Sequence, residues 1–260
     1  MRILFLGDIV GGASVDMVVR LVPPLKAGGR IDAVIANAEN AAAGSGLASS
    51  QFRALTQAGV DLLTLGDHAL RKREIVPILE NDRRICRPAN LAPRCPGNDL
   101  AVTTLPGGIR LAAFCVLGRT FMKPAECPLE AIDRLLARAE SEADIVVADL
   151  HAEATAEKLL LGRHLDGKVA AALGTHTHVP TADHCLLPLG TAYQTDVGMC
   201  GPHDGVLGRQ TEAVLRTTRS GLSEPWPLAT GDLRLNGAIV EIELGKRRAT
   251  AIEPFSAREP

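Results

Sequence analysis

The sequence predicts an α/β fold in which two packed sheets are flanked by helices. Apolar runs of strand length recur along the chain, and they are uninterrupted rather than alternating, which is typical of strands covered on both faces. Segments with helical spacing separate several of these runs, and the chain becomes richer in predicted strands toward its end. This order of elements fits one layered domain over residues 1–260.

The predicted elements follow from these runs and their boundaries. Strands are expected where apolar runs end at Gly, Asp, Asn or His, over residues 2–6, 33–36, 62–65, 111–116, 145–148 and 170–173. Helical spacing predicts helices over residues 15–25, 50–58, 129–143 and 154–165. Ser49 or Ser50 is the expected N-cap of the second helix, and Gly59 its stop. Later strands are expected at 186–195, 238–244 and 248–252, the last two joined by a hairpin turn at "LGKR".

Composition excludes several classes of protein. With 46% hydrophobic and 22% charged residues, the 260-residue chain can bury a substantial core. A net charge of -2 gives no cationic excess for holding a long nucleic acid. The six cysteines form no C-x-x-C pair, and no signal peptide or long apolar segment is evident. We therefore expect a cytoplasmic protein with free thiols and no membrane partner, and the oligomeric state, a homo-oligomer included, stays open.

Side chains that can bind metals follow five of the predicted strands, and ligands of α/β sheets bind beyond the carboxyl ends of strands. The five segments are Gly7-Asp8, Asn37 to Asn40, Gly66-Asp67-His68, Asp149 to His151 and Gly174 to His178. A single Asp here is more often a helix cap, and a single His is usually a hydrogen-bonded core residue. Recurrence at five strand ends favours a shared metal site, because buried acids and imidazoles need cations to offset desolvation.

The ligand types limit the metal and the chemistry. Carboxylate, amide oxygen and imidazole without thiolate suit manganese or iron, with zinc as a further choice. The candidates outnumber the ligands of one tetrahedral site, so we expect two divalent ions about 3.5–4 Å apart, bridged by a carboxylate. Such a pair can clamp a phosphoryl group and generate hydroxide at neutral pH. Phosphoester hydrolysis is therefore the expected reaction.

The order of these motifs resembles that of the calcineurin-like metallophosphoesterases. The match is closer to one branch, the YmdB-type phosphodiesterases, through "LFLGDIVG", "ANAENAAAGSGL", "LGDHALRKREI", "RPAN", "GRTFM", "DLHAEATAEK" and "GTAYQTDVGMCGP". The resemblance covers nearly the whole chain. It implies a four-layer αββα sandwich, a dinuclear metal site, and hydrolysis of small phosphodiesters, notably 2′,3′-cyclic nucleotides such as 2′,3′-cAMP.

The resemblance also implies roles for individual residues. One ion would be held by Asp8, Glu39, Asn40 and His178. The other would be held by Glu39, Asp67, His151 and His176, with Glu39 bridging. His68 would be the catalytic residue, placed over the phosphate to stabilise charge or to protonate the leaving oxygen while a metal-held hydroxide attacks phosphorus.

Secondary candidates have ordinary alternatives. Arg119 in "GRTFM" is a substrate-binding candidate, although a surface arginine is as reasonable an interpretation. Phe121 can line a nucleotide pocket, but core packing is the favoured interpretation. Asp196 can orient a metal-bound histidine, and a turn residue is the alternative.

Asp67 departs from the family, which normally has asparagine at this position. Two divalent ions with Asp8 and Glu39 leave a formal charge of about +2, and an ionised Asp67 lowers it to about +1. We therefore expect tighter metal binding, weaker Lewis acidity and a weaker attraction for an anionic diester. This departure supports a second hypothesis, a nucleotide-binding regulator that keeps its metals but turns over slowly. A phosphomonoesterase is the third.

Overall fold

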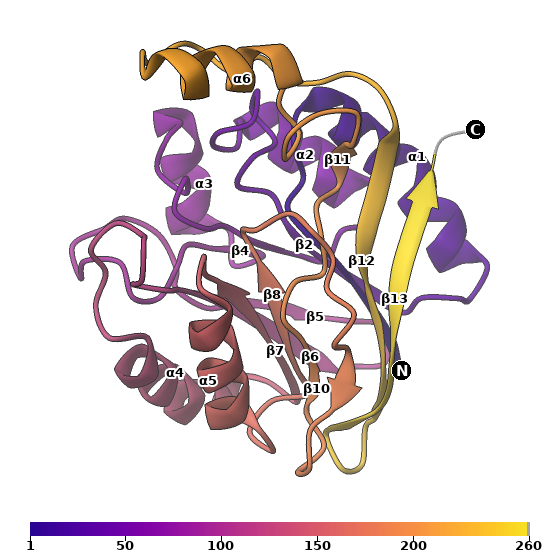
Figure 1. Cartoon of the computed structure of the whole chain (residues 1–260). Coiled ribbons are helices and arrows are strands. Elements are labelled where there is room, and N and C mark those ends of the chain that lie inside the picture. Colours follow the sequence, from indigo (N-terminus) through magenta and orange to yellow (C-terminus); the bar gives the residue numbers. More distant parts are fainter. Residues whose placement is uncertain (259–260) are drawn as a thin grey trace.

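The computed structural model describes residues 1–258, whose strands form two sheets (Figure 1). The first sheet has the order β11-β12-β1-β2-β3-β4, with β13 paired to the outer side of β12. Strands β1 to β4 run parallel, whereas β12 is antiparallel to β1. The bounds are β1 Arg2–Leu6, β2 Ala33–Asn37, β3 Leu62–Thr64, β4 Ile85–Cys86, β11 Gly201–Pro202, β12 Leu233–Glu243 and β13 Arg248–Arg258.

The second sheet has the order β5-β6-β7-β8-β10-β9. Its four inner strands run parallel, and the edge strands β5 and β9 are antiparallel to their neighbours. The bounds are β5 Ala101–Thr104, β6 Arg110–Leu117, β7 Ile145–His151, β8 Ala171–Thr175, β9 Cys185–Leu186 and β10 Ala192–Gln194. Both sheets therefore present the carboxyl ends of several parallel strands.

Helices cover the outer face of each sheet, so the layers are helices, sheet, sheet and helices, which confirms the four-layer αββα sandwich. In Figure 1, α4 and α5 lie on one side of the molecule, and α1 and α2 on the other. Helix α6 lies apart at the top of this view. The bounds are α1 Gly12–Ala27, α2 Ser49–Gln57, the 3-10 turn η1 Arg73–Ile75, α3 Val76–Asn81, α4 Pro128–Glu142, α5 Thr155–Leu165 and α6 Thr211–Ser220.

Strand β1 shows why its apolar run is uninterrupted. Ile3 and Phe5 point into the cluster between the sheets, where they join Ile35 of β2. Leu4 and Leu6 point the other way, into the cluster beneath α1 and α2. Because both faces of the strand are buried, every residue from Ile3 to Leu6 can be apolar.

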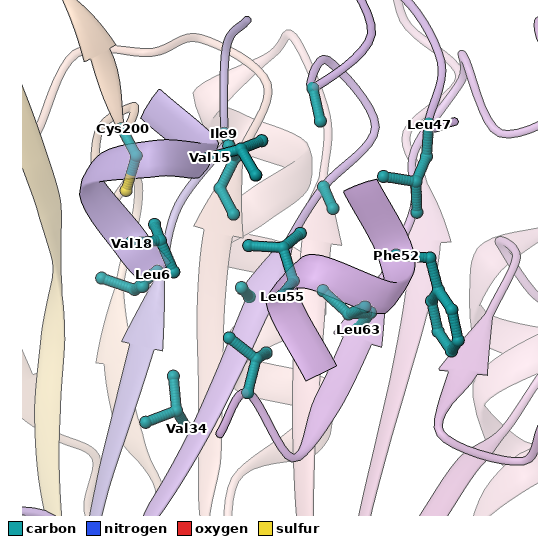
Figure 2. Packing of buried hydrophobic residues seen from close by; sticks show 14 of the residues in the cluster. Leu6, Ile9, Val15, Val18, Val34, Leu47, Phe52, Leu55, Leu63 and Cys200 are labelled. Carbon is teal, nitrogen blue, oxygen red and sulfur yellow. The ribbon is translucent and has the colours of Figure 1, made fainter. Parts of the chain in front are cut away.

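The cluster beneath α1 and α2 anchors both helices on the first sheet. Figure 2 shows Val18 of α1 beside Leu6, Val15 of α1 beside Ile9, and Leu55 of α2 beside Leu63. Each of these side chains is almost completely buried. Burying such a side chain stabilises the folded state by about 1.5–3 kcal/mol, so this packing fixes α1 and α2 against strands β1 and β3.

The six runs expected to be strands and the four segments expected to be helices all form, within a few residues of their expected ends. The hairpin between β12 and β13 also forms. Within the described chain, residues 1–258, no helix is both long and apolar enough to cross a bilayer.

Two local expectations are wrong. The N-cap of α2 is Ala48, whose backbone N–H donates to the Gln51 side chain, because the Ser49 hydroxyl donates to the carbonyl of Glu74 instead. Residues 186–195 do not form one strand, because the chain turns back at Gly190, which has a φ of 95°. Short strands β9 and β10 pair antiparallel on either side of that turn.

Candidate metal centre

The ends of five parallel strands bring the predicted ligands together from both sheets. Asp8, Glu39, Asn40 and Asp67 follow β1, β2 and β3 of the first sheet. The three histidines belong to the second sheet, where His151 is the last residue of β7, and His176 and His178 follow β8. The centre therefore lies where the two sheets meet, and neither sheet alone supplies all of its side chains.

One group of four residues can hold a metal ion. The ligand atoms of Glu39, Asp67, His151 and His176 all lie within 4.8 Å of one another. His151 Nε2 lies at the centre of the group, 3.2 Å from Glu39 Oε1 and 3.5 Å from Asp67 Oδ1. His176 Nδ1 lies 3.1 Å from that nitrogen. This is the same set that the resemblance implies for one ion.

The other expected set also contacts Glu39, whose Oε1 is 3.2 Å from Asn40 Nδ2. His178 Nε2 is 3.8 Å from Asp8 Oδ1 and 3.5 Å from Asn40 Nδ2. The Asn40 amide presents Nδ2 to this side and Oδ1 to His68 Nδ1, at 2.9 Å. A ligand role for Asn40 requires the amide to turn over, because only its oxygen can bind a cation.

Two buried carboxylate oxygens fit the binding of cations. Within residues 1–258, Asp8 Oδ1 and Asp67 Oδ1 are buried and accept no hydrogen bond. A buried carboxylate without a partner is strongly destabilising, and a divalent ion removes that penalty. Together with the imidazole nitrogens, these oxygens form a donor set that suits manganese, iron or zinc, so the residues present fit a metal centre.

The electrostatics of the metal-free chain point the same way. Burial lowers the pKa of His151, but the charges of Glu39, Asp67 and Asp8 outweigh it and hold that pKa well above its usual value. Burial raises the pKa of Glu39, yet His151 and His68 bring it well below its usual value. In the metal-free chain, the positive charge of protonated His151 thus offsets the negative charge of the nearby carboxylates. A metal ion would take over that role, so its binding would have to displace the His151 proton.

His68 lies at the rim of the centre. Its backbone N–H donates to Glu39 Oε2 at 2.9 Å, and Nδ1 contacts Asn40 Oδ1. Its Nε2 is 3.6 Å from Asp67 Oδ2. The side chain is 27% exposed, so a molecule that enters from solvent can reach it. The catalytic role of His68 stays a prediction.

The loop that carries His176 and His178 has a strained backbone, with φ values of 87° and 65°. Thr177, between them, is held by Asp196, whose carboxylate accepts the Thr177 backbone N–H at 3.1 Å and its hydroxyl at 2.6 Å. Lys158 Nζ donates to Asp196 Oδ2 at 2.8 Å, and both side chains are fully buried. Asp196 therefore acts on the peptide between the two histidines, not on an imidazole.

Lys158 is a residue that sequence reasoning missed. The signal was present, since Lys158, Leu161 and Leu165 share the buried face of α5 at helical spacing. A lysine on an otherwise apolar helix face indicates a buried partner, because lysine is almost never fully buried without one.

Arg119 lies in an exposed turn after β6. The backbone N–H groups of Arg119 and Thr120 donate to the Glu157 carboxylate, and the N–H of Gly118 donates to the carbonyl of His151. The turn is thus attached beside the centre, while the substrate-binding role of Arg119 stays a prediction. The favoured interpretation of Phe121 as a core residue is wrong, because its side chain is 89% exposed.

Comparison with known proteins gives consistent results over the whole chain. A model of the YmdB-like protein family matches residues 4–255. The 2′,3′-cyclic-nucleotide 2′-phosphodiesterase of Bacillus subtilis (strain 168) is 41% identical over 253 residues, covering 97% of this chain and 96% of that protein.

Two solved structures superpose closely. A hypothetical protein from Thermus thermophilus gives a TM-score of 0.93 at 42% identity, with 100% of both chains covered. A novel phosphatase from Mycoplasma pneumoniae gives 0.91 at 30% identity, covering 99% of this chain and 93% of that one. By the family match and these identities, the chain belongs to the YmdB-like family.

Proposed function

We propose that this protein is a dinuclear metal-dependent phosphodiesterase that opens 2′,3′-cyclic nucleotides such as 2′,3′-cAMP to monoesters. The observation that carries the proposal is the compact group Glu39, Asp67, His151 and His176 beside the partly exposed imidazole of His68. The activity for which the Bacillus subtilis relative is named supports the substrate class.

Within this mechanism, bound divalent ions would stabilise phosphoryl charge and supply a water-derived nucleophile at neutral pH. The chain's own residues position the reaction. Glu39 Oε1 contacts a residue of each ligand set, His151 and Asn40, and its Oε2 accepts the His68 backbone N–H, so its carboxylate links both sets to the catalytic residue. Once the Asn40 amide turns its oxygen to the metal side, its Nδ2 faces His68 Nδ1 and donates to it, so a neutral His68 carries its hydrogen on Nε2. Nε2 is therefore the ring atom that can donate a proton to the leaving oxygen.

The test compares three substrates with manganese added: 2′,3′-cAMP, bis(p-nitrophenyl) phosphate and p-nitrophenyl phosphate. We expect turnover of the diesters, and a loss of about 10²–10⁴ in kcat for His68→Ala with manganese binding retained. His164→Ala is the matched control, since His164 of α5 pairs with Asp133 of α4 at the surface. Turnover of the monoester alone would replace the proposal with a phosphomonoesterase.

Asp67 favours the second candidate, a nucleotide-binding regulator with weak turnover. Asp67 Oδ1 lies 3.5 Å from His151 Nε2 and 3.8 Å from His176 Nδ1, so its negative charge is inside the ligand group. Burial alone would raise the pKa of Asp67, but the nearby imidazoles of His151 and His68 outweigh it and lower that pKa. The side chain is therefore anionic at neutral pH, and it opposes the approach of an anionic diester.

Asp67→Asn separates the two candidates. Removing this charge should weaken manganese binding and raise the diester rate by about tenfold, or about 1.4 kcal/mol of barrier. Unchanged metal affinity together with an unchanged rate would contradict this role for Asp67. If the wild type binds manganese and 2′,3′-cAMP without turnover on any substrate, the regulator is the better description.

A further inference from the structure

Asp149 is a buried carboxylate that connects the two sheets directly beneath the metal centre. It lies in β7 and is fully buried. Its Oδ2 accepts hydrogen bonds from Asn37 Nδ2 of β2 at 2.9 Å and from the Thr64 hydroxyl of β3 at 2.6 Å. Its Oδ1 accepts the hydroxyl of Thr175, in β8, at 2.6 Å. All four residues are fully buried, two from each sheet.

The Thr175 hydroxyl extends this network to a metal-ligand candidate. Its oxygen lies 2.8 Å from His151 Nδ1. An ionised carboxylate can only accept, so the single Thr175 proton is donated to Asp149. The Thr175 oxygen must then accept a hydrogen bond from His151 Nδ1, so the hydrogen of a neutral His151 ring lies on Nδ1. When His151 is neutral, its Nε2 is therefore the bare nitrogen, and this is the atom that faces Glu39 and Asp67.

Asn37 extends the network to the other sheet's ligands. While its Nδ2 donates to Asp149, its Oδ1 accepts the backbone N–H of Glu39 at 3.1 Å. The start of the segment that carries Glu39 and Asn40 is thus tied to the same carboxylate that orients His151. A shift of Asp149 would move ligand candidates of both sheets at once.

We propose that Asp149 is a positioning residue for the metal centre, which selects the Nδ1–H tautomer of His151 through Thr175 and places Glu39 through Asn37. The proposal rests on the metal-binding role in the proposed function. A purely structural role, in which Asp149 only ties the sheets together, is the alternative. The two roles predict different results for two threonines that both bond Asp149. A purely structural role makes the Thr175 and Thr64 hydroxyls equally important, whereas the positioning role makes Thr175 more important, because only Thr175 contacts His151.

The experiment exploits this difference with two matched substitutions. Thr175→Val removes the hydroxyl between Asp149 and His151, whereas Thr64→Val removes a hydroxyl that bonds the same carboxylate but not His151. Thr175→Ser keeps the hydroxyl and serves as rescue. The manganese dissociation constant of each protein is measured by calorimetry in the absence of nucleotide. The His151 Nδ1–H signal is followed by NMR on ¹⁵N-histidine-labelled, metal-free protein at a pH above the raised pKa of His151, where the ring is neutral and its tautomer can be read.

We expect Thr175→Val to weaken manganese binding by about 10–100-fold and to abolish the Nδ1–H signal. Thr64→Val and Thr175→Ser should keep the wild-type affinity and the signal. Equal losses in Thr175→Val and Thr64→Val, or wild-type binding in Thr175→Val, would overturn the proposal. Should Thr175→Val not fold, the smaller Thr175→Ala makes the same test. A wild type that binds no manganese would contradict the proposed function instead.

Discussion

Gly66 allows the ligand group to assemble, and replacing it tests the geometry of the centre. A Cβ at this position would lie 2.3 Å from Glu39 Oε2 and 2.3 Å from His151 Nε2. Carbon atoms in ordinary contact are about 3.5–4.0 Å apart, so both ligand atoms would have to retreat by about 1 Å or more. Metal sites tolerate deviations of only about 0.2 Å in their bond lengths.

Gly66→Ala should therefore weaken manganese binding by at least about 100-fold, and overpacking should lower the free energy of unfolding by about 1–3 kcal/mol. Calorimetry with manganese and urea unfolding of the metal-free protein measure the two effects separately. Gly245→Ala is the matched control, because a Cβ there meets no atom within 4 Å.

The refuting result is clear-cut. If Gly66→Ala binds manganese as tightly as the wild type, then Glu39 and His151 do not hold the ion next to this backbone. A loss of stability without a loss of affinity would show that Gly66 serves only packing.

Two further predictions concern stability. Lys158→Met leaves the fully buried Asp196 without its cation, so the free energy of unfolding should fall by about 3–5 kcal/mol in urea titrations. The exposed control Lys168→Met should change it by less than about 0.5 kcal/mol. Equal effects of the two substitutions would contradict the stabilising role of the buried pair. Burial raises the pKa of the Cys86 thiol to about 12, while an unfolded thiol titrates near about 8.5. Between about pH 8.5 and 12 the Cys86 thiol is ionised in the unfolded chain but still protonated in the folded one. The free energy of unfolding should therefore fall as pH rises through this range, by up to about 1.4 kcal/mol per pH unit. Urea titrations at pH 8.5 and 10 should show a smaller decline for Cys86→Ala, and identical declines would refute this origin.

Some elements carried too little local signal to be predicted. Helix α6 was missed because only Ala213 of its ten residues is buried, so it lacks the apolar stripe that marks a helix packed on a sheet. Strand β4 has two residues, so its pattern is too short to recognise. Strands β9 and β10 were expected as one strand over residues 186–195, because the turn at Gly190 between them was not recognised. The longer elements were predictable, because two buried faces leave a continuous apolar run.

The sequence by itself determined the principal strands, the helices packed on them and the inventory of metal-capable side chains, since these follow from local burial and from the residues at strand ends. Only the tertiary structure decided how those side chains meet. Asn37 and Asp149 are hydrogen-bonded across 112 residues, and Asp8 accepts the N–H of His176 across 168. Such contacts depend on how two separately formed sheets stack, and no local pattern encodes that stacking. For the same reason, the sequence marked Asp67 as unusual, but only the tertiary structure showed that its carboxylate lies beside His151 and His176.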